Sequence, residues 1–126
     1  MLYLVFVGGC EDPFREVERY YTSRVKSSGV VRISELKEIK NMKGRAYITS
    51  PTGKEIEEQE FIELVRDSYV EEVSIAVGGP FGVPEDVEGT RISFSRLTYS
   101  HGLFRIMLLE QVYRALMTIK GSSYRK

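Results

Sequence analysis

The apolar positions of the chain fall into short continuous runs and longer periodic stretches, a pattern typical of alternating strands and helices. Residues 2–7 form a continuous apolar run of strand length that ends at two glycines, which predicts a buried strand. Asp12 and Pro13 then supply the cap and the first-turn proline of a helix. The inward face of this helix is expected to hold Phe14, Val17, Tyr21 and Val25.

The same patterns continue to the end of the chain. They predict strands at residues 30–39, 46–49, 73–77 and 91–94, and helices at about residues 56–69 and 102–119. The strand at 46–49 is expected to stop at the turn-forming segment 50–53, which reads Ser-Pro-Thr-Gly. The last helix is apolar around much of its circumference, which predicts packing on more than one side.

Strands that alternate with helices predict an α/β fold with a mostly parallel sheet. The chain of 126 residues has the length of one domain, so residues 1–126 are expected to fold as a single unit. In such sheets ligands bind outside the carboxyl ends of the strands. The loops after Val7, Thr49, Val77 and Phe94 are therefore the places to look for a site.

Composition narrows the classes of function. Cys10 is the single cysteine and His101 the single histidine, so no intrachain disulfide forms and no Cys-His metal site is expected. The apolar runs are too short to span a bilayer and the N-terminus lacks the basic flank of a signal peptide, so we expect a cytoplasmic protein with no membrane partner. The 18 basic and 18 acidic residues cancel, but basic residues gather at 24–45. That cluster is either a local basic face or ordinary solvated charge.

Two loops carry candidate chemistry. The turn from Gly78 to Gly82 follows a strand, and adjacent glycines allow a ligand to approach the backbone closely, although any sharp bend can use such a turn. The loop from Ser95 to His101 offers hydroxyls and backbone groups that suit a nucleoside. His101 lies at the start of a helix, where the helix dipole favours a neutral imidazole. It is either a site residue or a hydrogen-bonded residue that fixes the loop.

Read together, four segments resemble a known family. They are residues 77–82 (VGGPFG), 93–101 (SFSRLTYSH), 108–115 (LLEQVYRA) and the tail at 124–125 (YR). Their order and spacing are similar to the ribosomal large-subunit methyltransferase H family, which belongs to the SPOUT class. The resemblance implies a C-terminal trefoil knot, S-adenosyl-L-methionine as methyl donor, and a homodimer with its site at the interface. The implied substrate is ribosomal RNA, free or in the assembled ribosome, methylated at N3 of a (pseudo)uridine in the large subunit.

The resemblance also implies roles for individual residues. Donor contacts would come from three segments: Thr49 and Ser50; Gly78 and Gly79; and Ser95, Arg96, Leu97, Thr98, Tyr99 and Ser100. His101 and Arg105 would lie beside the site, and Tyr124 and Arg125 would close over the substrate. Four positions depart from the family pattern: Ser50 replaces the usual Asp, Phe81 the usual Glu, Ser100 the usual Pro and Arg125 the usual His.

Methyl transfer from a sulfonium is a direct displacement, so the protein must chiefly align the nucleophile and exclude water. We hypothesise that Arg125, Arg105 or Lys126 stabilises the developing anion and that His101 accepts the proton. Two alternatives stay open. One is a dimer that binds RNA or a nucleotide without transferring a methyl group, which the four departures motivate. The other is a small α/β protein that binds a different anionic ligand at the glycine turn.

Overall fold

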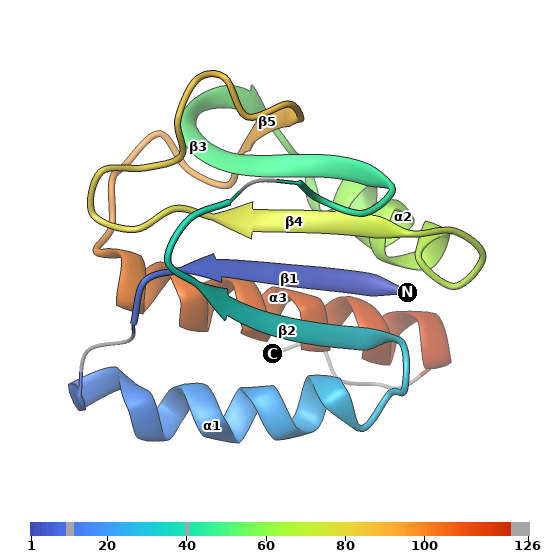
Figure 1. The fold of residues 1–126 in the computed structure, drawn as a ribbon. Helices are drawn as coiled ribbons and strands as arrows, with labels where there is room; N and C mark the ends of the chain where they lie inside the picture. The colour runs from blue at the N-terminus through green and yellow to red at the C-terminus, as the bar shows by residue number, and fades with distance from the viewer. Residues whose placement is uncertain (10–11, 40, 122–126) are drawn as a thin grey trace.

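The computed structural model describes residues 1–9, 12–39 and 41–121, which form five strands and three helices (Figure 1). The elements follow in the order β1 (Leu2–Val7), α1 (Asp12–Lys26), β2 (Val31–Leu36), β3 (Arg45–Glu55), α2 (Glu58–Asp67), β4 (Val73–Val77), β5 (Thr90–Ser93) and α3 (His101–Lys120). The predicted α/β fold is therefore confirmed, and each expected strand and helix is present.

The five strands form one sheet in the order β2-β1-β4-β3-β5, and all the pairings between them are parallel. The three helices cover the same face (Figure 1), and their apolar side chains join those of β1 and β4 in one large core. The opposite face is covered by loop residues around Ile39, Met42, Val83 and Val87. Because both faces are covered, β4 is buried along its whole length, as its continuous apolar sequence predicts.

The last helix, α3, lies between the other two helices and contacts both. Ser100 caps its first turn by accepting a hydrogen bond from the Leu103 amide at 3.4 Å. The helix ends at Gly121, whose φ of 89° is the left-handed conformation that favours glycine. Leu108, Leu109 and Val112 are fully buried in the core. The expectation of packing on more than one side is confirmed.

Two details of the sequence interpretation are wrong. β3 does not stop at residue 49, because after an irregularity at 50–53 it pairs with β5 again: both Thr49 and Lys54 lie opposite Ile92. The expected inward face of α1 also differs, since Val17 is 45% exposed while Glu18 is buried. Glu18 turns inward because it binds an arginine of α3, a partner 87 residues away that helical periodicity cannot reveal.

Within the described ranges, no helix is long and apolar enough to cross a membrane. The same residues contain no group of three or more His, Cys, Asp or Glu side chains placed to bind a metal ion.

Candidate functional site

A pocket of about 200 Å³ lies at the carboxyl end of β4, between the irregular part of β3 and the segment that joins β5 to α3. It is lined by Thr49, Ser50, Pro51, Val77, Gly78, Gly79, Pro80, Gly82, Phe94, Ser95, Leu97, Thr98, Tyr99, His101 and Phe104. Three of the four loops expected to carry a site therefore meet here. The fourth, after Val7, does not line the pocket but contacts His101.

The turn after β4 forms the first wall. The Gly82 amide donates to the Gly79 carbonyl at 3.0 Å, and Gly82 has a φ of 74°. A Cβ atom on Gly78 would lie 2.5 Å from the Gly82 carbonyl carbon, so this position accepts only glycine without a shift of the backbone. The tip of the turn, Phe81, is fully exposed and does not line the pocket. Phe81, where the family usually has glutamate, therefore does not alter the surface of the pocket.

The irregular part of β3 forms the second wall. The Thr49 hydroxyl donates to the Ala76 carbonyl of β4 at 3.0 Å, which ties the start of this segment to the neighbouring strand. The Ser50 hydroxyl oxygen lies 3.0 Å from that of Thr52 and accepts from the Thr52 amide at 3.3 Å. Gly53 then packs against β5, where a Cβ atom would lie 2.6 Å from the Arg91 carbonyl carbon. The segment that looked like a strand stop is thus a shaped excursion within one strand.

The segment from Phe94 to Ser100 forms the third wall. It is held by local hydrogen bonds: the Ser93 hydroxyl donates to the Ser95 carbonyl at 2.9 Å and the Leu97 amide to the Ser95 hydroxyl at 3.1 Å. Arg96 points away from the pocket. Its Nη1 donates to the carbonyls of Pro51 and Gly53, each at 2.9 Å, and its Nε to Glu55 at 3.1 Å. Arg96 therefore braces this wall against β3 instead of lining the pocket.

Of the remaining expected site residues, the structure places some in the pocket and others outside it. His101 lines the pocket, whereas Ser100 caps α3 and is not among the lining residues. Arg105 is 1% exposed and bound to carboxylates of α1 and β2, so the structure does not bring its side chain to the pocket. A direct contact of Arg105 with a bound anion is therefore not seen in this arrangement. Tyr124 and Arg125 lie outside the described residues.

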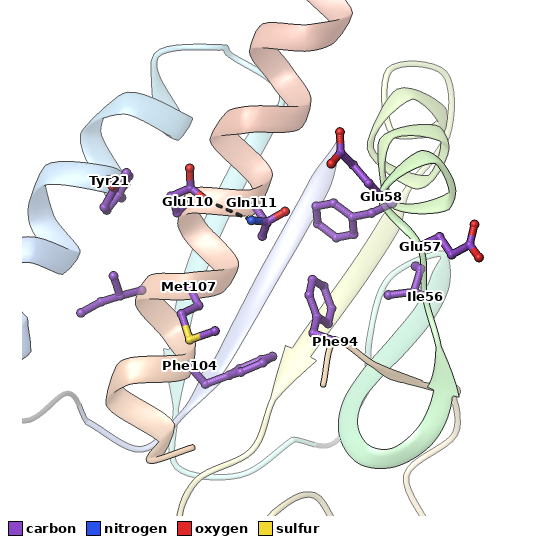
Figure 2. Close-up of a pocket in the computed structure, with 11 residues that line it drawn as sticks. Tyr21, Ile56, Glu57, Glu58, Phe94, Phe104, Met107, Glu110 and Gln111 are labelled. Carbon is purple, nitrogen blue, oxygen red and sulfur yellow. Dashed lines mark hydrogen bonds between the residues drawn. The ribbon is translucent and has the colours of Figure 1, made fainter. Parts of the chain in front are cut away.

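Two aromatic residues of the pocket were not predicted, Phe94 and Phe104. Their rings meet edge to face with centroids 5.7 Å apart, and Phe94 meets Phe61 of α2 in the same way at 5.2 Å. Phe94 and Phe104 also line a second hollow of about 500 Å³ beside α3 (Figure 2). We call it the α3 groove; its other lining residues are Tyr21, Ile56, Glu57, Glu58, Phe61, Ile106, Met107, Glu110 and Gln111. The pocket and this α3 groove therefore share an aromatic wall. The sequence did contain a signal for Phe104: it follows His101 by three residues in a predicted helix, so the two side chains lie on the same side of that helix.

The pocket surface is mainly apolar, with a smaller uncharged polar part. Its lining residues include no carboxylate, lysine or arginine, and its polar groups are backbone amides and carbonyls, hydroxyls and the His101 imidazole. Such a surface selects a ligand by shape and hydrogen bonds instead of net charge. A nucleoside with polar edges and an apolar ring face fits this description, with Phe94, Phe104 and Leu97 as apolar surface.

Comparison with known proteins agrees with this geometry. A family model described as "Predicted SPOUT methyltransferase" matches residues 14–125. A ribosomal RNA large subunit methyltransferase H from Mycoplasmopsis agalactiae is 30% identical over 98% of this chain and 97% of its own length. A protein of the same name from Thermosipho melanesiensis is 36% identical over 78% of this chain and 68% of its own. A putative one from Methanococcus vannielii is 33% identical over 69% and 60%.

Proposed function

Because this chain belongs to the ribosomal RNA large subunit methyltransferase H family of SPOUT methyltransferases, we propose that it methylates large-subunit ribosomal RNA with S-adenosyl-L-methionine as donor. We propose N3 of a uridine or pseudouridine as the atom methylated. The observation that supports the donor most directly is the pocket without charged side chains that is lined by three glycines of the turn after β4, by residues 49–51 and by most of the segment that joins β5 to α3.

The residues of the pocket fit this donor. Gly78, Gly79 and Gly82 offer backbone groups without side chains in the way, and Thr49, Ser50 and Thr98 add hydroxyls for ribose or amino-acid oxygens. The absence of a basic side chain among the lining residues suits a ligand that carries a sulfonium cation. When bound, the donor supplies an electrophilic methyl group.

The protein's contribution to the reaction is alignment and one proton transfer. The pocket residues would hold the donor with its methyl group facing the ring nitrogen, which would take the methyl group while the displaced electron pair stayed on sulfur. A ring imide nitrogen must lose its proton to attack, and His101 is the titratable side chain among the lining residues that can accept it. Arg125, in the tail, is proposed to stabilise the anionic ring, a role suited to a guanidinium.

We also propose the homodimer and the knot. The pocket of about 200 Å³ is below the roughly 300 Å³ at which sites begin to enclose drug-sized ligands, so a second chain would cover the rest of the donor and substrate. The α3 groove is the surface we assign to that contact, because it shares Phe94 and Phe104 with the pocket. The trefoil knot would form where the segment leading into α3 passes the ends of β3 and β4.

The proposed function predicts both donor binding and turnover. Titration calorimetry should show binding of S-adenosyl-L-methionine and of its demethylated product. Large ribosomal subunits from a strain that lacks the gene should be unmethylated at one uridine or pseudouridine and should gain the methyl group from the purified protein and the donor, as mass spectrometry of the rRNA will show. His101→Ala should lower the single-turnover rate by about 100-fold, the lower end of what a positioned general base contributes. Arg125→Ala should also lower it.

Each result has a distinct meaning. Donor binding without a methyl mark in the wild-type strain would indicate a non-catalytic RNA- or nucleotide-binding protein. No affinity for the donor would overturn the proposal altogether. Unchanged single-turnover rates in both variants would remove the catalytic roles of His101 and Arg125 while leaving the methyltransferase activity in place.

A further inference from the structure

The first two turns of α3 contact the loop that follows β1. His101 Nε2 lies 3.2 Å from the Gly9 carbonyl oxygen, and Arg105 Nη1 donates to the Gly8 carbonyl at 3.0 Å. His101 and Arg105 are four residues apart, so they lie on the same side of the helix. Two adjacent carbonyls of the β1 loop are thus bound by a pocket residue and by a buried arginine one turn below it.

Arg105 is held from three elements at once. Its Nη2 donates to Glu18 of α1 at 3.0 Å and to Glu35 of β2 at 2.5 Å. Its Nε lies 3.0 Å from the other Glu18 oxygen, in an ion pair that lacks hydrogen-bond alignment. The guanidinium carbon lies 4.4 Å from the centre of the Phe6 ring. A buried, planar group with this many partners has one arrangement, so it fixes the β1 loop relative to α3.

The contact between His101 and Gly9 determines which ring nitrogen carries a proton. A backbone carbonyl can only accept a hydrogen bond, so Nε2 must be the donor at 3.2 Å. In a neutral imidazole the other nitrogen, Nδ1, is then an acceptor. Among the described residues, none forms a hydrogen bond with Nδ1. The β1 loop therefore selects the tautomer in which Nδ1 is ready to take a proton.

We infer that Arg105 is a positioning residue for the proton acceptor: by fixing Gly8 and Gly9 it holds His101 as the Nε2–H tautomer and leaves Nδ1 for the substrate proton. The inference rests on the proposed function. In the step itself the ring N–H proton moves to Nδ1, and the nitrogen electron pair forms the bond to the methyl carbon. The bond from that carbon to sulfur breaks with its electron pair left on sulfur, and the imidazolium keeps its Nε2–H bond to Gly9. The proton then leaves to solvent.

The single histidine makes this testable by nitrogen NMR, because a ¹⁵N-labelled sample contains one imidazole. The wild-type spectrum of the neutral ring should show the proton on Nε2. In Arg105→Lys, the forked donor is lost while the charge stays, so Gly8 and Gly9 are held less firmly. The two tautomers should then mix, and the single-turnover rate should fall about tenfold, part of a general base's contribution.

The matched control is Arg45→Lys. Arg45 also binds two carboxylates, Asp67 at 2.7 Å and Glu71 at 2.5 Å, but its side chain is 47% exposed and does not line the pocket. This control should change neither the histidine spectrum nor the rate. If Arg105→Lys fails to fold, Glu35→Gln removes one charge from the same cluster, at a side chain 41% exposed, and should produce a smaller change of the same kind.

Three results would overturn the inference: an Nδ1–H tautomer in the wild type, an unchanged spectrum in folded Arg105→Lys, or an unchanged rate in that variant. If neither Arg105→Lys nor Glu35→Gln altered the spectrum and the rate, the cluster would be structural only. The NMR measurement requires no turnover. An inactive wild type with the Nε2–H tautomer would therefore contradict the proposed function and not the assignment of the tautomer.

Discussion

Gly78 shows how one residue without a side chain shapes the pocket. Its backbone lies so close to Gly82 that the turn from 78 to 82 closes on itself, and the Gly79 and Gly82 backbones meet in a hydrogen bond. A larger residue at 78 would push this turn apart. The wall that we assign to the donor therefore depends on a contact between backbone atoms and not on a side-chain interaction.

Gly78→Ala should weaken donor binding about tenfold or more, equivalent to roughly 1.4 kcal/mol, because the added Cβ displaces the turn. Calorimetry measures this directly. Gly44→Ala is the comparison, since its Cβ would lie 1.9 Å from the Glu72 carbonyl oxygen at a site that does not line the pocket. The comparison variant should lose thermal stability and keep its donor affinity at temperatures where it is folded. Equal affinity in Gly78→Ala would show that this wall does not bind the donor.

At the scale of elements, α3 is preceded by Ser100, where the family usually has proline, and the serine cap takes over the effect of the proline on the helix start. Proline restricts the backbone before a helix, whereas Ser100 accepts a hydrogen bond from the first turn. Both residues favour a helix that begins at His101. The departure at Ser100 therefore preserves the placement of His101 and does not weaken the enzymatic interpretation.

Ser100→Ala should lower the free energy of unfolding by about 1 kcal/mol, the usual value of a helix cap, as urea denaturation will show. Ser100→Asp keeps an acceptor at the same place and should restore most of the loss. If alanine and aspartate were equally stable, the cap would not contribute to stability.

The elements also show which parts of the fold local sequence patterns can predict. β4 and α3 were predicted almost to the residue, because a continuous apolar run and a helical apolar pattern are local signals. The continuation of β3 past Gly53 depends on pairing with β5, which lies almost 40 residues later, so the turn-like residues at 50–53 were misleading. The burial of Arg105 could not be predicted for the same reason: its carboxylate partners, Glu18 and Glu35, come from distant elements.

The pocket itself was predicted in outline, since parallel strands bring their carboxyl-end loops together. Of the ten residues that the family resemblance implies as donor contacts, eight line the pocket, while Arg96 and Ser100 do not. These two residues do not line the pocket because their side chains bind elsewhere, Arg96 to β3 and Ser100 to the first turn of α3. Arg96 turns towards β3 carbonyls that only the folded sheet places within its reach.

On the scale of the whole molecule, the α3 groove (Figure 2) is the surface proposed for self-association, and it shares Phe94 and Phe104 with the proposed donor pocket. Its apolar surface includes Ile106 and Met107 of α3 and the outer faces of Phe94 and Phe104. A second chain packed here would press on the rings that form the inner wall of the pocket. Dimer formation and donor affinity are therefore expected to change together.

Met107→Glu adds a carboxylate to the apolar part of this groove, which Glu57, Glu58 and Glu110 also line. The change should convert a dimer into a monomer, with a fall in donor affinity of about tenfold, or roughly 1.4 kcal/mol. Light scattering gives the mass and calorimetry the affinity. Val70→Glu adds the same charge at a side chain that is 87% exposed and outside the groove, and should change neither. A wild-type chain that is monomeric and fully active would contradict the proposed interface.

The late position of the third pocket wall in the sequence has a consequence for the order in which the pocket forms during synthesis of the chain. The segment 94–101 and its support, α3, are translated after every other element described here. A nascent chain that ends before α3 has the sheet strands but lacks His101, Phe104 and the arginine that steadies the first loop. Such a chain lacks part of the proposed donor pocket, so this pocket can be completed only after α3 has left the ribosome.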